Sequence, residues 1–166
     1  VNGIVQGVGF RPHVFQLARL YRLNGDVSNT SSGVRIRIEG PPERLDAFET
    51  DLVQKSPPLA FIVEVSAETV PPKPCRDFRI VQSNANTVVS TLISPDVSIC
   101  SDCLAEMFDP EDRRYRYPFI NCTNCGPRYT IIDDIPYDRP KTSMRSFKMC
   151  PRCQAEYDDP TDRRFH

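Results

Sequence analysis

The sequence has no long run of apolar residues and no marked excess of either charge among its 166 residues. A transmembrane helix needs about 20 consecutive apolar residues, and no segment approaches that length. No signal-peptide pattern is present either. The formal net charge of −1 gives no general attraction to nucleic acid or to an acidic membrane surface. We therefore expect a globular protein that has neither nucleic acid nor a membrane as a partner.

Cysteine is scarce in one part of the chain and concentrated in the other. Only one of the seven cysteines lies before residue 84, in the part that also has the longer periodic segments. This distribution predicts a domain over residues 1–83, a linker over 84–99 and a second module over 100–166. A short strand at Val88–Leu92 is expected in the connection. The chain starts with Val1 inside an expected strand, which indicates a fragment of a longer protein.

The first domain has the periodicity of a small α+β fold. Apolar residues from Val14 to Tyr21 follow the i, i+3, i+4, i+7 spacing of an amphipathic helix. Pro12 fits the first position of this helix, and Gly25 fits a helix stop. The strands are expected at residues 1–5, 25–29, 34–39, 61–67 and 78–80. A second helix is expected to begin at Pro41 and Pro42, with Leu45, Phe48 and Leu52 on one face. Up to the strand at 61–67 the order is βαββαβ, the ferredoxin-like arrangement, and the short strand at 78–80 follows it.

The stretch VQGVGFR, residues 5–11, lies between the first strand and the first helix. Backbone N–H groups at a helix N-terminus carry partial positive charge and bind phosphate. Gly7 and Gly9 allow the preceding loop to form a nest of amides, and Arg11 adds a planar fork for two oxygens. The alternative is an ordinary strand-to-helix turn with a solvated arginine, and the spacing alone leaves both interpretations open.

Together, VQGVGFR and the later GDVSNTSSGV resemble the acylphosphatase signature, over nearly all of residues 1–83. Members of that family hydrolyse carboxyl–phosphate mixed anhydrides. Their loop amides and arginine hold the phosphate, and an asparagine orients the attacking water, so the resemblance assigns catalytic roles to Arg11 and Asn29. His13 is expected at the surface without a catalytic role. The substrate-binding loop that the resemblance implies consists of Gln6, Gly7, Val8, Gly9, Phe10 and Arg11.

Six cysteines form three Cys-x-x-Cys pairs, namely Cys100/Cys103, Cys122/Cys125 and Cys150/Cys153. The first two pairs are 18 residues apart, which predicts a Cys₄ zinc site. In a sequential arrangement these two pairs bind one ion and the third pair forms half of a second site. In a crossed arrangement the first and third pairs share the ion. Four thiolates leave no open position, so the zinc is expected to be structural.

The seventh cysteine, Cys75, is expected to be an inert loop thiol. Because the other six are arranged as metal-binding pairs rather than as a disulfide framework, the pattern indicates a reducing, cytoplasmic compartment.

The second module contains an internal repeat with an offset of 50 residues. The segment CSDCLAEMFDPEDRRYR from Cys100 aligns without a gap with CPRCQAEYDDPTDRRFH from Cys150. Both contain Cys-x-x-Cys-x-Ala-Glu followed by Asp-Pro-x-Asp-Arg-Arg. This self-similarity predicts two copies of one structural unit. The second copy would need its second cysteine pair beyond the last residue, so we expect it to be truncated.

An acylphosphatase-like domain followed by this repeat, with the run FINCTNCGPRYTI, resembles the N-terminal part of the HypF family of carbamoyltransferases in hydrogenase maturation. Members use carbamoyl phosphate and ATP and load a HypE-type acceptor protein, with ATP used by later domains. The resemblance implies that this part hydrolyses carbamoyl phosphate to carbamate and phosphate and carries structural zinc. The alternatives are a free-standing acylphosphatase and a non-catalytic, zinc-stabilised interaction module.

Overall fold

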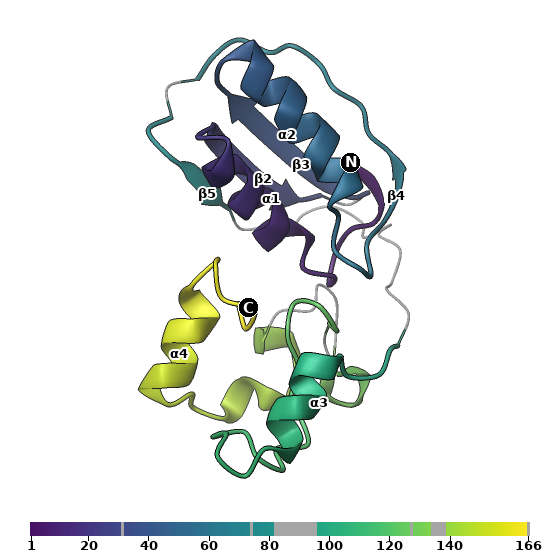
Figure 1. Cartoon of the computed structure of the whole chain (residues 1–166), viewed down its shortest axis with the longest axis vertical. Helices are drawn as coiled ribbons and strands as arrows, with labels where there is room; N and C mark the ends of the chain where they lie inside the picture. The colour runs from purple at the N-terminus through teal and green to yellow at the C-terminus, as the bar shows by residue number, and fades with distance from the viewer. Residues whose placement is uncertain (31, 74, 82–95, 127, 134–138, 166) are drawn as a thin grey trace. The chain divides into compact units, whose positions relative to one another are not determined.

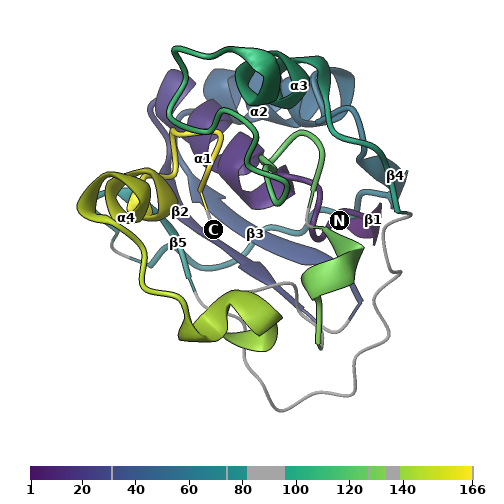
Figure 2. The same ribbon diagram turned by 90° about the horizontal axis from the view of Figure 1, so that it is seen from below.

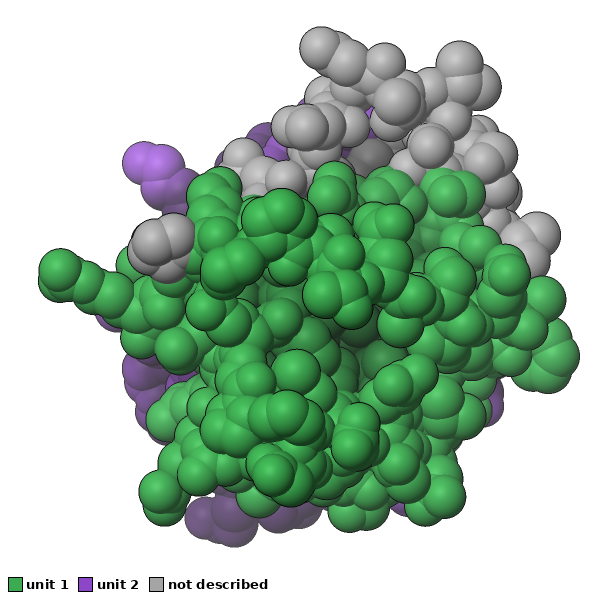
Figure 3. All heavy atoms as spheres, turned by 90° about the horizontal axis from the view of Figure 1, so that it is seen from above, with its two compact units in different colours: residues 1–94 green, residues 95–166 purple. Residues whose placement is uncertain are grey.

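The structure, a computed structural model, describes residues 1–30, 32–73, 75–81, 96–126, 128–133 and 139–165. The chain divides into two compact units, residues 1–94 and 95–166, drawn in green and purple in Figure 3. The predicted strand at Val88–Leu92 lies outside the described residues. Within the described part, every helix is too short or too polar to cross a bilayer.

Unit 1 confirms the predicted α+β class and the order of its elements (Figure 1). Strand β2 pairs antiparallel with β3 and parallel with β5, while β1 pairs antiparallel with β4. A bridge between Asn2 and Gly33 links the two sets of strands. The elements are β1 (Asn2–Ile4), α1 (Phe10–Leu20), β2 (Asn24–Asn29), β3 (Val34–Glu39), α2 (Pro42–Gln54), β4 (Phe61–Glu64) and β5 (Phe78–Ile80).

Helices α1 and α2 lie on the same face of the sheet formed by β2 and β3 (Figures 1 and 2). Their apolar sides bury Val14 and Leu17 from α1 and Phe48 and Leu52 from α2. Val27 in β2 is completely buried against them. The core therefore lies between one helical layer and one face of the sheet, as expected for this α+β arrangement.

The predicted boundaries of the first helix are wrong at both ends. Helix α1 starts at Phe10, so Pro12 is its third residue, where its missing N–H still leaves no hydrogen bond unmade. The helix ends at Leu20, and Arg22, which lies just beyond the capping residue Tyr21, adopts the left-handed conformation with φ 52°. Leu23 N–H donates to the Ala18 carbonyl (2.8 Å) across this residue, as in a Schellman motif.

Gly25 belongs to β2 and does not end the helix. Its φ of 139° and its close approach to β3 explain the glycine, because a Cβ there would lie 1.9 Å from the Arg37 carbonyl oxygen. The strand expected at residues 61–67 is also shorter in the structure, because β4 ends at Glu64 rather than near Ala67. Ile62 is the residue of β4 that packs against the core.

Unit 2 contains two helices at matching positions of the repeat. Helices α3 (Ser101–Phe108) and α4 (Pro151–Asp158) directly follow Cys100 and Cys150. These two cysteines have nearly identical backbone angles, φ −71° and ψ 165° against φ −69° and ψ 161°. Three short 3₁₀ helices between α3 and α4 cover Tyr129–Ile131, Arg139–Lys141 and Ser143–Ser146.

The turn that follows each helix is repeated as well. Glu111 N–H donates to Asp109 Oδ1 (2.9 Å), and Thr161 N–H donates to Asp159 Oδ1 (2.8 Å) in the second copy. The predicted internal repeat is thus present in the backbone and in its side-chain hydrogen bonds.

Candidate active site and metal centre

The glycine loop before α1 has the backbone of an anion-binding nest. Gly7 and Gly9 both adopt left-handed angles, φ 71° and 76°, and Gly9 directly precedes the helix. Val8 and Phe10 are completely or almost completely buried, so their side chains belong to the core. Only the backbone of these two residues can therefore contact a ligand, close to the positive end of the α1 dipole. Arg11 is the second residue of α1 and is half-buried.

Gln6 connects this loop to the turn between β2 and β3. Its side-chain Nε2 donates to the carbonyl oxygens of Thr30 (2.9 Å) and Gly33 (2.7 Å). Both hydrogens of the amide are used, and Gln6 is 9% exposed. The Gln6 side chain is thus occupied by the hairpin turn, which leaves its backbone as the part of Gln6 that can face a ligand.

Asn29 is the last residue of β2, immediately before that turn. It is 7% exposed, and its Oδ1 is buried with no hydrogen-bond partner among the described residues. A buried carboxamide oxygen without a donor costs about 1–3 kcal/mol, so such an atom marks a place where a donor from outside the protein is favoured. The Gln6 hydrogen bonds hold the nest beside the turn that Asn29 enters.

The prediction that His13 lies at the surface holds only in part, because the residue is half-buried. Its Nε2 is buried without a partner among the described residues, and its ring centroid lies 6.2 Å from that of Phe10. Burial lowers the pKa of His13, an effect that a hydrogen bond to the Leu52 backbone and the Asp51 carboxylate partly oppose. The histidine is therefore a packed residue of the α1–α2 contact that favours its neutral form.

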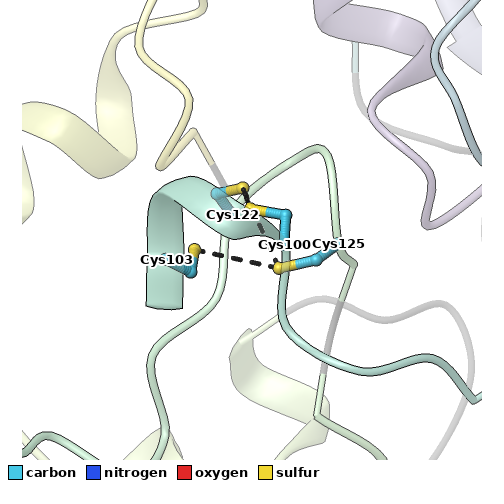
Figure 4. A group of neighbouring side chains, drawn as sticks. All are labelled: Cys100, Cys103, Cys122 and Cys125. Carbon is cyan, nitrogen blue, oxygen red and sulfur yellow. Dashed lines mark hydrogen bonds between the residues drawn. The ribbon is translucent and has the colours of Figure 1, made fainter. Parts of the chain in front are cut away.

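Four cysteines of unit 2 meet in one cluster (Figure 4). Their sulfurs all lie within 4.8 Å of one another, with separations of 3.6 Å for Cys100–Cys122 and 3.9 Å for Cys122–Cys125 and Cys103–Cys125. Four sulfurs at about 2.3 Å from a tetrahedral Zn²⁺ lie about 3.8 Å apart. The cluster therefore fits a zinc ion and has the sequential combination of pairs rather than the crossed one.

The electrostatics of the cluster favour thiolates at part of the site. The pKa of Cys125 is lowered to about 4, first because Cys122 donates a hydrogen bond to its sulfur. The same hydrogen bond raises the pKa of Cys122, and burial raises the pKa of Cys103. Arg128 braces the turn around Cys125, donating through Nη2 to the carbonyl oxygens of Cys125 (2.9 Å) and Gly126 (3.1 Å).

The third cysteine pair lies apart from this cluster, at the start of α4. Cys150 is exposed and Cys153 is half-buried. The Cys153 N–H donates to Cys150 Sγ (3.4 Å), and this backbone hydrogen bond is the largest cause of a Cys150 pKa lowered to about 7. Two sulfurs alone supply half of a tetrahedral site.

Several positioning contacts were not anticipated from the sequence, namely the side chains of Gln6 and Arg128 and the arginine pairs of the repeat. The arginine pairs carried a signal, because Asp-Arg-Arg occurs at the same place in both copies. Gln6 carried none of its own, since a glutamine beside two glycines does not indicate where its amide points.

Two known families match this chain in separate parts. Residues 1–80 match the acylphosphatase family, and residues 99–132 and 149–166 match the HypF finger. An acylphosphatase from Thermotoga petrophila is 41% identical over 81 residues, which cover 48% of this chain and 89% of that protein.

Longer relatives match both parts together. The carbamoyltransferase HypF of Rhodobacter capsulatus is 49% identical over 168 residues, which cover 100% of this chain and 22% of the relative. A crystal structure of full-length HypF in its phosphate- and nucleotide-bound form matches with a TM-score of 0.89 and 54% identity, over 99% of this chain and 22% of that one. The chain thus spans about a fifth of the length of these relatives.

Proposed function

Because the chain belongs to the HypF family of carbamoyltransferases and corresponds to its N-terminal acylphosphatase and finger region, we propose that unit 1 hydrolyses carbamoyl phosphate to carbamate and phosphate. The observation that carries this proposal is the left-handed pair Gly7 and Gly9 at the start of α1, tied by Gln6 to the turn after Asn29.

The loop and Arg11 bind the phosphoryl group. Amides of residues 6–10 and the α1 dipole supply partial positive charge, and the Arg11 guanidinium supplies two parallel donors to its oxygens. Because Val8 and Phe10 are anchored in the core, the nest is rigid and loses little entropy when the dianion binds.

Asn29 orients the attacking water. Its buried Oδ1 accepts a hydrogen bond from the water and so directs a lone pair of the water oxygen toward phosphorus. The water oxygen forms a bond to phosphorus, the bond from phosphorus to the carbamate oxygen breaks, and the water protons pass to the phosphate products and solvent. Carbamate is a good leaving group, so positioning and charge stabilisation suffice without a strong general base.

In unit 2 we propose structural zinc at Cys100, Cys103, Cys122 and Cys125. Zinc there would join Cys100 and the first turn of α3 to the turn at Cys122–Cys125, and the separations among the four sulfurs support this choice. The seven free cysteines are consistent with a reducing cytoplasm. Transfer to a HypE-type acceptor, with ATP, is proposed only for the complete protein.

Hydrolysis and phosphate binding, measured together, test the assignment. We expect Arg11→Ala to abolish phosphate binding seen by ³¹P NMR titration. We expect Asn29→Ala to retain phosphate binding and to lower kcat for carbamoyl phosphate about 10²–10³-fold, as for the loss of a transition-state contact. A preference for carbamoyl phosphate over other acyl phosphates separates this function from that of a general acylphosphatase.

Matched controls lie on the same elements. Arg19 is exposed near the end of α1, and Asn24 lies at the opposite end of β2 from Asn29. Arg19→Ala and Asn24→Ala should leave both measurements within about twofold of the parent. Parental hydrolysis in both Arg11→Ala and Asn29→Ala would refute the proposed active site and leave the interaction module as the better interpretation of the chain.

A further inference from the structure

The repeat in unit 2 shares a glutamate and an arginine pair as well as cysteines, and these groups pair across the two copies. Glu106 of the first copy accepts hydrogen bonds from Arg163 and Arg164 of the second copy. Glu156 of the second copy accepts hydrogen bonds from the arginine pair of the first, Arg113 (2.5 Å) and Arg114. Each copy therefore supplies the arginines that bind the other copy's glutamate.

The same guanidinium groups also reach the cysteine sulfurs. Arg163 Nη1 and Arg164 Nη1 each lie 3.5 Å from Cys103 Sγ. At the matching position, Arg113 Nη1 lies 3.3 Å from Cys153 Sγ and 3.8 Å from Cys150 Sγ. In both directions, therefore, the arginines of one copy contact a glutamate and at least one cysteine of the other copy.

Backbone contacts anchor this arrangement at the four-cysteine cluster. Thr123 N–H, inside the second cysteine pair, donates to the Arg163 carbonyl (2.8 Å). Arg164 also donates to the Asn121 carbonyl, directly before Cys122. The Arg164 side chain is only 10% exposed, so its charge lies beside the cluster with little water around it. Arg164 of the second copy therefore contacts Cys103 in the first cysteine pair and Asn121, the residue directly before the second pair.

We propose that Arg163 and Arg164 of the second copy complete the outer shell of the zinc site in the first copy, so that tight metal retention there requires both copies. This inference rests on the proposed zinc binding. A Zn²⁺ ion with four thiolates carries a net charge of −2, and two guanidinium groups that donate to a ligand sulfur offset it. Glu106 accepts hydrogen bonds from both arginines and holds them in place. Because arginine remains charged at all relevant pH values, the two positive charges stay beside the site.

The rate of zinc release from the 166-residue chain tests this coupling. The zinc-loaded protein is mixed with an excess of a chromophoric chelator, and zinc transfer is followed by absorbance. We expect Arg164→Met, and more strongly Arg163→Met/Arg164→Met, to accelerate release about 10–100-fold, the range for loss of an outer-shell partner. Arg164→Lys keeps the charge and should recover part of the parental rate, which a purely steric role would not predict.

The control is Arg152→Met, which removes an exposed arginine of the second copy that lies on α4. Cobalt(II) loading of each variant reports, through its sulfur-to-metal absorption, that four thiolates still form the site. Parental release from Arg163→Met/Arg164→Met, or an equal acceleration in Arg152→Met, would overturn the inference. A parent chain that binds no zinc would instead refute the proposed metal site, so the two failures are distinguishable.

Discussion

Unit 1 and unit 2 are each stabilised by a different kind of interaction. The main buried cluster of unit 1 comprises twelve hydrophobic residues, whereas the buried cluster described in unit 2 has four members, of which three are cysteines. Apolar burial stabilises by about 25 cal/mol per Å², so unit 1 has a driving force for folding that unit 2 lacks. We therefore expect a module with so small a core to depend on metal ligation and ion pairs instead.

Loss of one metal ligand should show most clearly that the two units are stabilised in different ways. Cys103 is completely buried in the cluster, and Cys103→Ser removes one of its four thiolates. We expect this variant to lose most of its bound zinc and the ordered structure of unit 2, because zinc binding in such modules contributes about 10–16 kcal/mol to folding. Unit 1 should keep its fold, as measured by amide hydrogen exchange resolved by segment.

The matched control is Cys75→Ser, which alters a half-buried free thiol of unit 1. Zinc content measured by atomic spectroscopy should equal that of the parent. If Cys103→Ser exposed the amides of α1 and α2 as strongly as those of α3, the two units would not differ in what stabilises them.

The converse change acts on the core of unit 1. Phe48 is 2% exposed in the centre of α2, and Phe48→Ala leaves a cavity between α2 and the sheet. We expect the free energy of unfolding of unit 1 to fall by about 3–5 kcal/mol, while zinc release from unit 2 keeps its parental rate. Urea denaturation followed by hydrogen exchange measures the first quantity.

Phe61→Ala provides the control, because Phe61 is 63% exposed on β4 and its truncation leaves no cavity. The change in unfolding free energy should stay within about 0.5 kcal/mol. An effect of Phe48→Ala on zinc release would show that the core of unit 1 also supports unit 2.

A smaller effect is expected where unit 1 depends on a polar contact, at Gln6. Gln6→Met keeps the length of the side chain but removes both hydrogen bonds to the hairpin turn. The loss leaves the Thr30 carbonyl without this donor and should destabilise unit 1 by about 1–3 kcal/mol. The turn positions Asn29, so its displacement should lower kcat for carbamoyl phosphate. The nest amides remain, so the affinity for phosphate should fall less than kcat.

Gln16→Met serves as the comparison, since Gln16 is exposed on α1. It should change neither thermal unfolding nor kcat by a measurable amount. Equal losses of kcat and phosphate affinity in Gln6→Met would mean that the side chain maintains the nest rather than the position of Asn29.

The two units also differed in how well their structure could be predicted from the sequence. In unit 1 the periodic apolar residues identified both helices and the strands β3 and β4, because each pattern reflects burial against one core. The strand β2 was predicted from the hairpin that it forms with β3. The end of α1 was missed, since Arg22 takes a left-handed conformation that sequence rules reserve for glycine or asparagine. The hydrogen bond that Leu23 N–H donates across it to the Ala18 carbonyl stabilises this conformation.

In unit 2 the spacing of cysteines predicted a four-cysteine cluster but left two groupings of the pairs open, and the structure has the sequential one. The repeat predicted two copies of one structural unit but gave no helices, so α3 and α4 were not predicted. The sequence could not indicate that Glu106 pairs with Arg163 rather than with Arg113 of its own copy, because both choices satisfy the same motif. Partners about 50 residues apart are selected by the way the copies pack, which a local pattern does not encode.

The smallest effect should be a dependence of the stability of unit 1 on the titration of His13. Burial lowers the pKa of His13 below its ordinary value of 6.5. As the pH falls below about 6.5, the unfolded chain takes up a proton that the folded chain excludes, so the free energy of unfolding declines until the pH reaches the folded pKa. Chemical denaturation at a series of pH values from 7.5 to about 5 measures this slope.

His13→Gln removes the titrating group and should flatten the decline. Asp51 provides the comparison, because the hydrogen bond from Lys55 lowers the pKa of this carboxyl below 3.8, and the stability it contributes is lost only at more acidic pH. Asp51→Asn should therefore lower stability at neutral pH. Because it also removes the charge that opposes the lowering of the His13 pKa, it should keep or steepen the slope near pH 6. An unchanged slope in His13→Gln would instead assign the pH dependence to groups outside the contact between α1 and α2.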